Sequence, residues 1–280
     1  MKSNTKSIVW FLVIAFAITW ASILAIYLLG DVPSSGTGEV SSNPMVGLLS
    51  MLGTFGPAIA AFVVRKWVTR EGFKDAGLRF NFRKGWAYYL WAVLAPLAGG
   101  VITVFVAGTT GADVSNLNAI SATDIISWLV GSLIWTPILF GEEFGWRGYL
   151  QQRLAPGRPL LAAIWMGLIW GIYHYAHVLS GITMSANPTA LLIYPFYCIM
   201  GSIILGWLRD KSQSIWPACL AHAVGNVIVS GLTAKLLPNV SDISVFVFTL
   251  IGEAVVALVL ALSRRVPWRD TETLQATLQV

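Results

Sequence analysis

The sequence predicts an all-α membrane protein with about eight transmembrane helices. Only 11% of its 280 residues are charged, 56% are hydrophobic, and the mean hydropathy is +0.71. A composition this apolar lies outside the class of soluble globular proteins. Because backbone groups in lipid must bond internally, only helices or closed barrels span a bilayer, and long continuous apolar runs favour helices.

Apolar runs of about 20 residues are the second observation, because that length crosses the hydrocarbon layer of a bilayer. The first run is longer than the core of a signal peptide, so we interpret it as an anchor. The fourth run is short unless residues 142–154 continue the same helix. The predicted spans are 8–29, 45–64, 86–107, 125–140, 160–179, 191–208, 215–232 and 245–262.

The charges of the connecting loops are the third observation. Lys and Arg precede the first span and follow the second, fourth, sixth and eighth. The intervening loops together contain Asp31, Glu39, Asp113, Asp124 and Asp242, with Lys235 as their only basic residue. This alternation follows the positive-inside rule and predicts that both termini are cytoplasmic. The net charge of +5 therefore indicates topology in a multi-pass protein of the cell membrane, not binding to nucleic acid.

The sequence predicts one membrane domain over residues 1–280. Its polar groups concentrate in 124–232, which we predict to be the functional core, with the first three spans and the last one as scaffold. The segment 69–85 is either an amphipathic stretch on the membrane surface or an ordinary charged loop. Glu253, alone in the last span, is favoured as a structural residue that faces the bundle interior. Cys198 and Cys219 indicate no disulfide framework.

Glu142, Glu143 and Arg147 lie near the end of the fourth span. An ionisable residue within the membrane indicates a functional site by default, because charge is costly there. Glu143 and Arg147 are four residues apart on one helix face and are predicted to pair. Glu142 points about 100° away, so it is left free to act as a general base.

Two later spans carry the three histidines. Trp170 and His174 are one helical turn apart, and His177 lies one turn beyond as a partner or a spectator. His222 and Asn226 share a helix face, and both can donate hydrogen bonds to a developing oxyanion. Each cluster alone has a structural explanation, since polar side chains in membranes often only join helices at about 0.6 kcal/mol each. Three clusters together favour a single functional site.

A metal ion is an alternative for this site. His174, His222 and Glu142 are acceptable zinc ligands, and a catalytic zinc site needs three ligands and an open position. The H-E-x-x-H signature of zinc proteases is absent from the sequence. We therefore favour a site with no cofactor and keep a zinc-dependent membrane protease as the alternative.

The ordered motifs E-E-x-x-x-R, aromatic-x-x-x-H and H-x-x-x-N resemble those of the CAAX-protease and bacteriocin-processing family of intramembrane proteases, over about residues 124–232. The resemblance implies that Glu142 and His174 position and deprotonate a water molecule. It also implies that His222 and Asn226 stabilise the oxyanion while Glu143 and Arg147 support the site. Two departures stand out: the family more often has phenylalanine at the position of Trp170, and His177 offers a second alignment through Tyr173.

The implied partners are membrane lipid and a peptide or membrane-anchored protein as substrate. Prenylated C-termini, bacteriocin leader peptides and signalling peptides all fit the resemblance. The depth of Glu142 and His222 predicts a cavity open to the cytoplasm that delivers water. Two functions of other classes stay open: an ion-coupled transporter, although no inverted repeat is evident, and a non-catalytic immunity protein.

Overall fold

The computed structural model describes residues 5–30, 41–114, 116–182 and 188–262, and within these ranges the regular structure is helical. Eight helices are long and apolar enough to cross a membrane, as predicted. Four of them are single α-helices: α1 (Thr5–Leu28), α3 (Phe82–Thr109), α8 (Pro188–Ser212) and α11 (Asp242–Leu262).

The other four spans are interrupted. Turns of π-helix continue three of them, and the fifth span breaks at His174. Such π turns are rare and frequently occur at functional sites. In chain order the segments are α2 (Pro44–Val63) with η1 (Val64–Val68), α4 (Ala122–Gly145) with η4 (Trp146–Leu150) and α5 (Gln151–Leu154), α6 (Pro159–Tyr173) with α7 (Tyr175–Leu179), and α9 (Trp216–Val224) with η5 (Gly225–Val229) and α10 (Ser230–Leu236). The fourth span thus runs to Leu154, as the sequence predicted.

Local sequence explains where several helices begin. Asn43 caps α2 and accepts a hydrogen bond from the Met45 backbone N–H, with Pro44 in the first turn. Ser121 and Asp124 form a capping box at the start of α4. These side chains satisfy backbone donors that a helix N-terminus leaves free. Pro217 likewise lies in the first turn of α9, where a missing N–H costs nothing.

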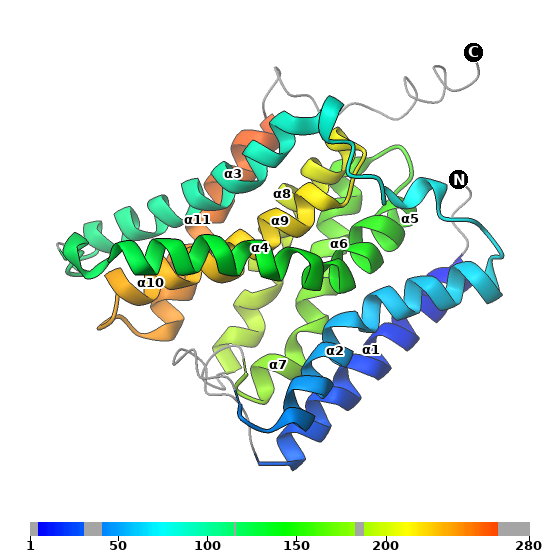
Figure 1. The fold of residues 1–280 in the computed structure, drawn as a ribbon, viewed down its shortest axis with the longest axis horizontal. Helices are drawn as coiled ribbons and strands as arrows, with labels where there is room; N and C mark the ends of the chain where they lie inside the picture. Colours follow the sequence, from blue (N-terminus) through cyan, green and yellow to red (C-terminus); the bar gives the residue numbers. More distant parts are fainter. Residues whose placement is uncertain (1–4, 31–40, 115, 183–187, 263–280) are drawn as a thin grey trace.

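The helices form two diverging groups joined by a central set (Figure 1). On one side α1 packs along α2, and on the other α3 packs along α11. Between them α6 packs on α8, and α4 crosses from α2 to α9. The carboxyl end of α4 therefore lies between α2 and α9, and Trp170 of α6 bonds to Glu142 there, so Glu142 and Glu143 are buried.

Glycines permit the closest helix contacts. A Cβ atom at Gly171 of α6 would lie 2.5 Å from the Cα atom of Pro195 in α8, and one at Gly145 of α4 would clash with Pro57 of α2. No side chain fits at such distances, so these glycines let the helix backbones touch. Gly171 thereby brings His174 and α8 to the same cavity wall.

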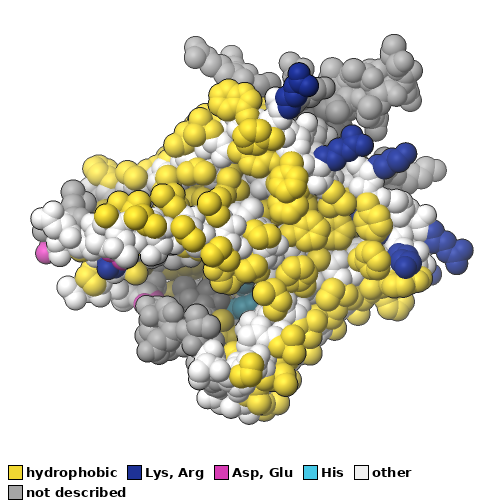
Figure 2. All heavy atoms as spheres, in the orientation of Figure 1, with side chains coloured by type: hydrophobic (Ala, Val, Ile, Leu, Met, Phe, Trp, Pro, Cys, Tyr) yellow, Lys and Arg dark blue, Asp and Glu magenta, His cyan; other side chains and the backbone are white. Residues whose placement is uncertain are grey.

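The outer surface is mostly apolar (Figure 2). Large hydrophobic side chains such as Leu28, Phe105 and Leu192 are 74%, 69% and 73% exposed. Soluble monomers rarely expose such continuous apolar area, whereas lipid-facing helices do. In the same view most Lys and Arg side chains lie at one end of the molecule, which agrees with the alternation of loop charges. The orientation of the termini stays a prediction.

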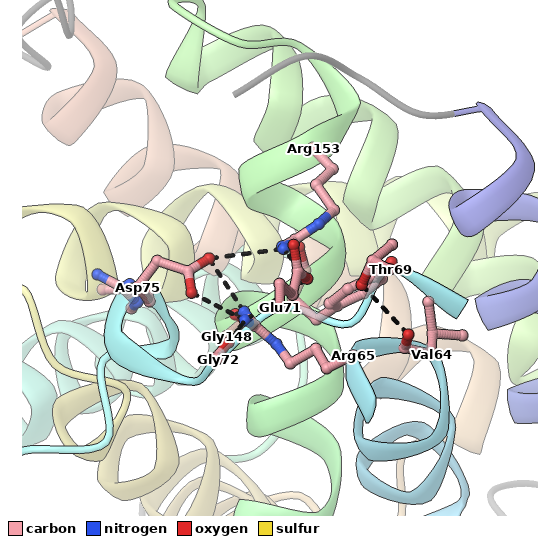
Figure 3. A network of polar contacts seen from close by, with 10 residues as sticks. Val64, Arg65, Thr69, Glu71, Gly72, Asp75, Gly148 and Arg153 are labelled. Atoms are coloured by element: carbon pink, nitrogen blue, oxygen red, sulfur yellow. Dashed lines mark hydrogen bonds and ion pairs between the residues drawn. The ribbon is translucent and has the colours of Figure 1, made fainter. Parts of the chain in front are cut away.

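The segment between η1 and α3 is the charged loop of the two alternatives drawn from the sequence, and its polar side chains bond to the core (Figure 3). Its regular structure is the single 3₁₀ turn η2 (Lys74–Ala76), not an amphipathic helix. Arg65 is fully buried and donates to Asp75 at 2.8 and 3.1 Å and to the Gly148 carbonyl at 2.9 Å. Arg153 forms an ion pair with Glu71. Burial alone would raise the pKa of Asp75, but the hydrogen bonds and charge of Arg65 outweigh it and hold that pKa below its ordinary value.

Candidate active site

Glu143 and Arg147 form a buried ion pair in the last turn of α4 and the first of η4. Both side chains have 0% exposure, and Arg147 Nη1 lies 2.8 Å from Glu143 Oε1, as their spacing predicted. His222 Nδ1 in α9 lies 2.9 Å from the same oxygen. Glu143 therefore links the fourth span to the seventh and sets the orientation of the His222 ring.

We expect Arg147→Met to destabilise the protein by about 3–5 kcal/mol, because it leaves the buried Glu143 carboxylate without its main counter-charge. Thermal unfolding of the purified protein in one detergent measures this. The double variant Glu143→Gln/Arg147→Met removes both charges and should lose less stability than the sum of the two single variants. Strict additivity would contradict a coupled pair.

Glu142 faces away from that pair, as its position on the helix predicted. Its Oε2 atom accepts hydrogen bonds from the indole nitrogens of Trp170 at 2.9 Å and Trp146 at 3.3 Å. These two donors hold the carboxyl group in place. Both bonds go to Oε2, so Oε1 is the oxygen available to a water molecule. Sequence reasoning missed Trp146, although its position four residues after Glu142 was a usable signal.

The tryptophan that departs from the family pattern thus has a specific role. The Trp170 ring also packs against the Arg147 guanidinium, with Arg147 Cζ 4.5 Å from the ring centroid. Phenylalanine keeps the aromatic ring but cannot donate to Glu142. We expect Trp170→Phe to lower kcat about tenfold, equal to about 1.4 kcal/mol, with KM little changed. Trp165→Phe, on the exposed face of the same helix, is the control and should behave like the wild type.

His174 lies at the break between α6 and α7. Its Nδ1 atom is 2.8 Å from the Trp170 carbonyl oxygen. A carbonyl only accepts, so Nδ1 carries a proton, and the neutral ring keeps a free lone pair on Nε2. The ring of His177 lies 5.0 Å from that of His174. The sequence predicted a continuous helix through His174; the side chain instead bonds the carbonyl one turn back where the helix ends.

The four predicted catalytic residues line one cavity of about 480 Å³. Glu142 comes from α4, His174 from the α6–α7 junction, His222 from α9 and Asn226 from η5. Glu143 and Arg147 do not contribute to its wall and lie behind it. Side chains from separate spans therefore share one cavity, which is a condition for acting on one bound molecule.

The scaffold spans contribute more than expected. Ile23 of α1, Gly53 of α2, Pro96 of α3 and Glu253 of α11 all line the same cavity. The functional core predicted from polar residues therefore omits part of the cavity wall. Apolar residues and glycines that only line a cavity cannot be recognised as wall residues from a single sequence.

The lining residues also show where along the helices the cavity lies, whereas its opening to the cytoplasm stays a prediction. Its wall residues in α1 and α2, such as Ile26 and Ser50, lie in the helix halves far from the basic loops, and Ile182 belongs to the connection after α7. Figure 2 shows a histidine in a hollow away from the Lys and Arg side chains. The lining residues Ile26, Ser50 and Ile182 therefore place part of the cavity toward the end opposite the basic loops.

The donor groups do not form a ready metal site. Within the described ranges, no group of three or more His, Cys, Asp and Glu side chains is arranged to hold a metal ion. Glu142 Oε2 is already bound by two indoles, and the Nδ1 atoms of His174 and His222 are engaged. Glu142 Oε1 and the Nε2 atoms of His174 and His222 are the donor atoms left over, the zinc alternative stays a prediction, and we derive no step through a metal.

These features define a class of protein: a polytopic helical membrane protein whose helices enclose an acid and imidazole site. Residues 122–228 match the family model described as type II CAAX prenyl endopeptidase Rce1-like. This match supports the CAAX protease family, and the resemblance that the three motifs indicated is confirmed over this region. No curated protein matches the chain.

Proposed function

We propose that the chain is an intramembrane endopeptidase that hydrolyses a peptide bond in a membrane-associated peptide or protein. The match to the CAAX protease family supports hydrolysis of this general kind. The observation that carries the mechanism is the single cavity lined by Glu142, His174, His222 and Asn226. Water-activated hydrolysis fits an acid and an imidazole that face one space.

In the proposed reaction, water lies between Glu142 Oε1 and His174 Nε2. Glu142 takes a proton as the water oxygen attacks the peptide carbonyl carbon, which forms a C–O bond and a tetrahedral oxyanion. Glu142 then gives that proton to the peptide nitrogen, and the C–N bond breaks. The amine and the carboxylic acid leave, so atoms and charge balance with one water consumed.

His222 and Asn226 would bind the oxyanion. Since Nδ1 of His222 donates to Glu143, the ring can donate to the oxyanion only from Nε2 and only as an imidazolium ion. Glu143 supplies the counter-charge for that ion, and Arg147 holds Glu143 in place. This explains why a second buried carboxylate follows the first and why it lies behind the cavity wall.

The proposed mechanism uses no metal. We expect the purified protein to keep its hydrolytic rate after prolonged treatment with a strong chelator, with no zinc detected by elemental analysis. The measurement is peptide cleavage before and after the treatment, with a known zinc protease treated in parallel. Loss of cleavage that only zinc restores would replace this mechanism by a metal-dependent one.

Membrane peptides from cells with the wild-type chain should be compared with peptides from cells that carry Glu142→Gln. New peptide ends that depend on Glu142 would support the endopeptidase and identify substrates. Altered proton-linked flux without new ends would favour the transporter. If the variants Glu142→Ala, His174→Ala and His222→Ala all keep the full biological effect of the wild type, the non-catalytic binding protein would be favoured.

A further inference from the structure

Glu253 is an ionisable residue that the proposed reaction does not use. It lies in the middle of α11 and lines both the site cavity and an adjoining cavity of about 530 Å³. The two cavities share Tyr197, Asn226 and Ser230 in their walls, so Glu253 lies where they meet. Its Oε2 atom is buried and has no hydrogen-bond partner within the described residues, and Tyr197 is its polar neighbour.

The described surroundings of Glu253 contain no Lys or Arg side chain. Among the described residues, neither cavity is lined by Lys or Arg, although Glu142, Glu253 and Asp242 all contribute to the walls. Helices α3 and α8 pack against α11, and Glu253 lies against Gly99 and Gly201 of these helices. Their basic residues lie at the far helix ends, the nearest being Arg209, about 12 Å along α8 from Gly201.

A buried carboxylate with no Lys or Arg beside it is costly, and a cation that binds it recovers much of that cost. The cavity therefore has a wall that favours a positively charged or neutral occupant over an acidic one. The shared residue Asn226 belongs to the proposed oxyanion site, so an occupant that reaches Glu253 also lies beside the reacting bond.

We propose that Glu253 selects the substrate: its carboxylate binds the ammonium or guanidinium group of a Lys or Arg side chain close to the bond that is cleaved. This proposal rests on the proposed endopeptidase function for its biological meaning. The preference for a Lys or Arg side chain over an uncharged one is a property of the cavity, so it can be measured by binding, without cleavage.

The test uses three end-blocked peptides, acetyl-Leu-Leu-X-Leu-Leu-amide, in which X is Lys, norleucine or Glu. Norleucine matches the aliphatic part of Lys without its charge. Binding is measured by calorimetry to the full chain carrying Glu142→Gln in lipid nanodiscs, with empty nanodiscs subtracted. We expect the Lys peptide to bind about tenfold more tightly than the norleucine peptide, equal to about 1.4 kcal/mol, and the Glu peptide to bind most weakly.

Glu253→Gln should remove the Lys preference and leave the affinity for the norleucine peptide unchanged. Thr249→Val is the matched control, because Thr249 lies one turn earlier on α11 in the wall of the adjoining cavity and bonds within its own helix. It should keep the preference. Equal binding of the Lys and norleucine peptides to the Glu142→Gln chain overturns the proposal, even if Glu253→Gln does not fold. A Lys preference that survives Glu253→Gln also overturns it.

Failure of the two proposals is distinguishable. If the wild-type chain shows no Glu142-dependent cleavage but still prefers the Lys peptide through Glu253, the endopeptidase function fails and the cation site stands. If cleavage occurs and the preference is absent, the endopeptidase stands and Glu253 is structural.

Discussion

Replacement of Glu142 by glutamine is expected to lower the rate constant for peptide hydrolysis by about 10²–10⁴-fold, the usual contribution of a general base. The glutamine carbonyl oxygen can still accept the Trp170 indole N–H that now lies 2.9 Å from Glu142 Oε2. The fold and the cavity shape should therefore survive. The measurement is single-turnover cleavage of a peptide identified by the membrane comparison.

Thr54→Val is the control for that experiment. Thr54 lines the same cavity, and its hydroxyl donates to the Ser50 carbonyl within α2, so the change removes no group from the proposed chemistry. It should cleave at the wild-type rate with the wild-type melting temperature. Wild-type cleavage by Glu142→Gln would remove Glu142 from the mechanism.

The two neighbouring histidines should differ sharply in their effect. His174→Gln is expected to lower cleavage by about 10²–10⁴-fold, because it removes the free ring nitrogen that we place beside the water. His177→Gln should stay within a fewfold of the wild type, since no step uses this side chain although it lines the cavity. Rates of both purified variants, at equal amounts of folded protein, check this.

This comparison also decides between the two alignments of the second motif. Loss of cleavage in His177→Gln with retention in His174→Gln would favour the register through Tyr173. The structure supports His174, because Gly171 allows close contact with Pro195 of α8 and Trp170 bonds to Glu142. Tyr173 is instead bonded to Thr19 of α1 at 2.8 Å, away from that carboxylate.

Much of the fold was predictable because a bilayer imposes simple requirements. Seven predicted spans match helices of the structure to within about four residues at each end, and the fourth matches once residues 142–154 continue it to Leu154, since length and continuous hydrophobicity decide whether a segment can cross lipid. The pairing of Glu143 with Arg147 followed from helix geometry alone. The break at His174 and the π turns after Gly145 and Val224 were not predictable, because they depend on side-chain bonds and neighbouring helices.

The amino-acid sequence by itself determined the helical membrane architecture, the alternation of loop charges and the identity of the polar residues in three motifs, because these follow from local composition and spacing. Only the tertiary structure decided that Glu142, His174, His222 and Asn226 line one cavity and that Trp146 and Trp170 hold Glu142. It also decided that Glu253 lines that cavity, whose described wall contains no Lys or Arg. Contacts between residues distant in the chain arise from helix packing, and a single sequence contains no periodic signal for them.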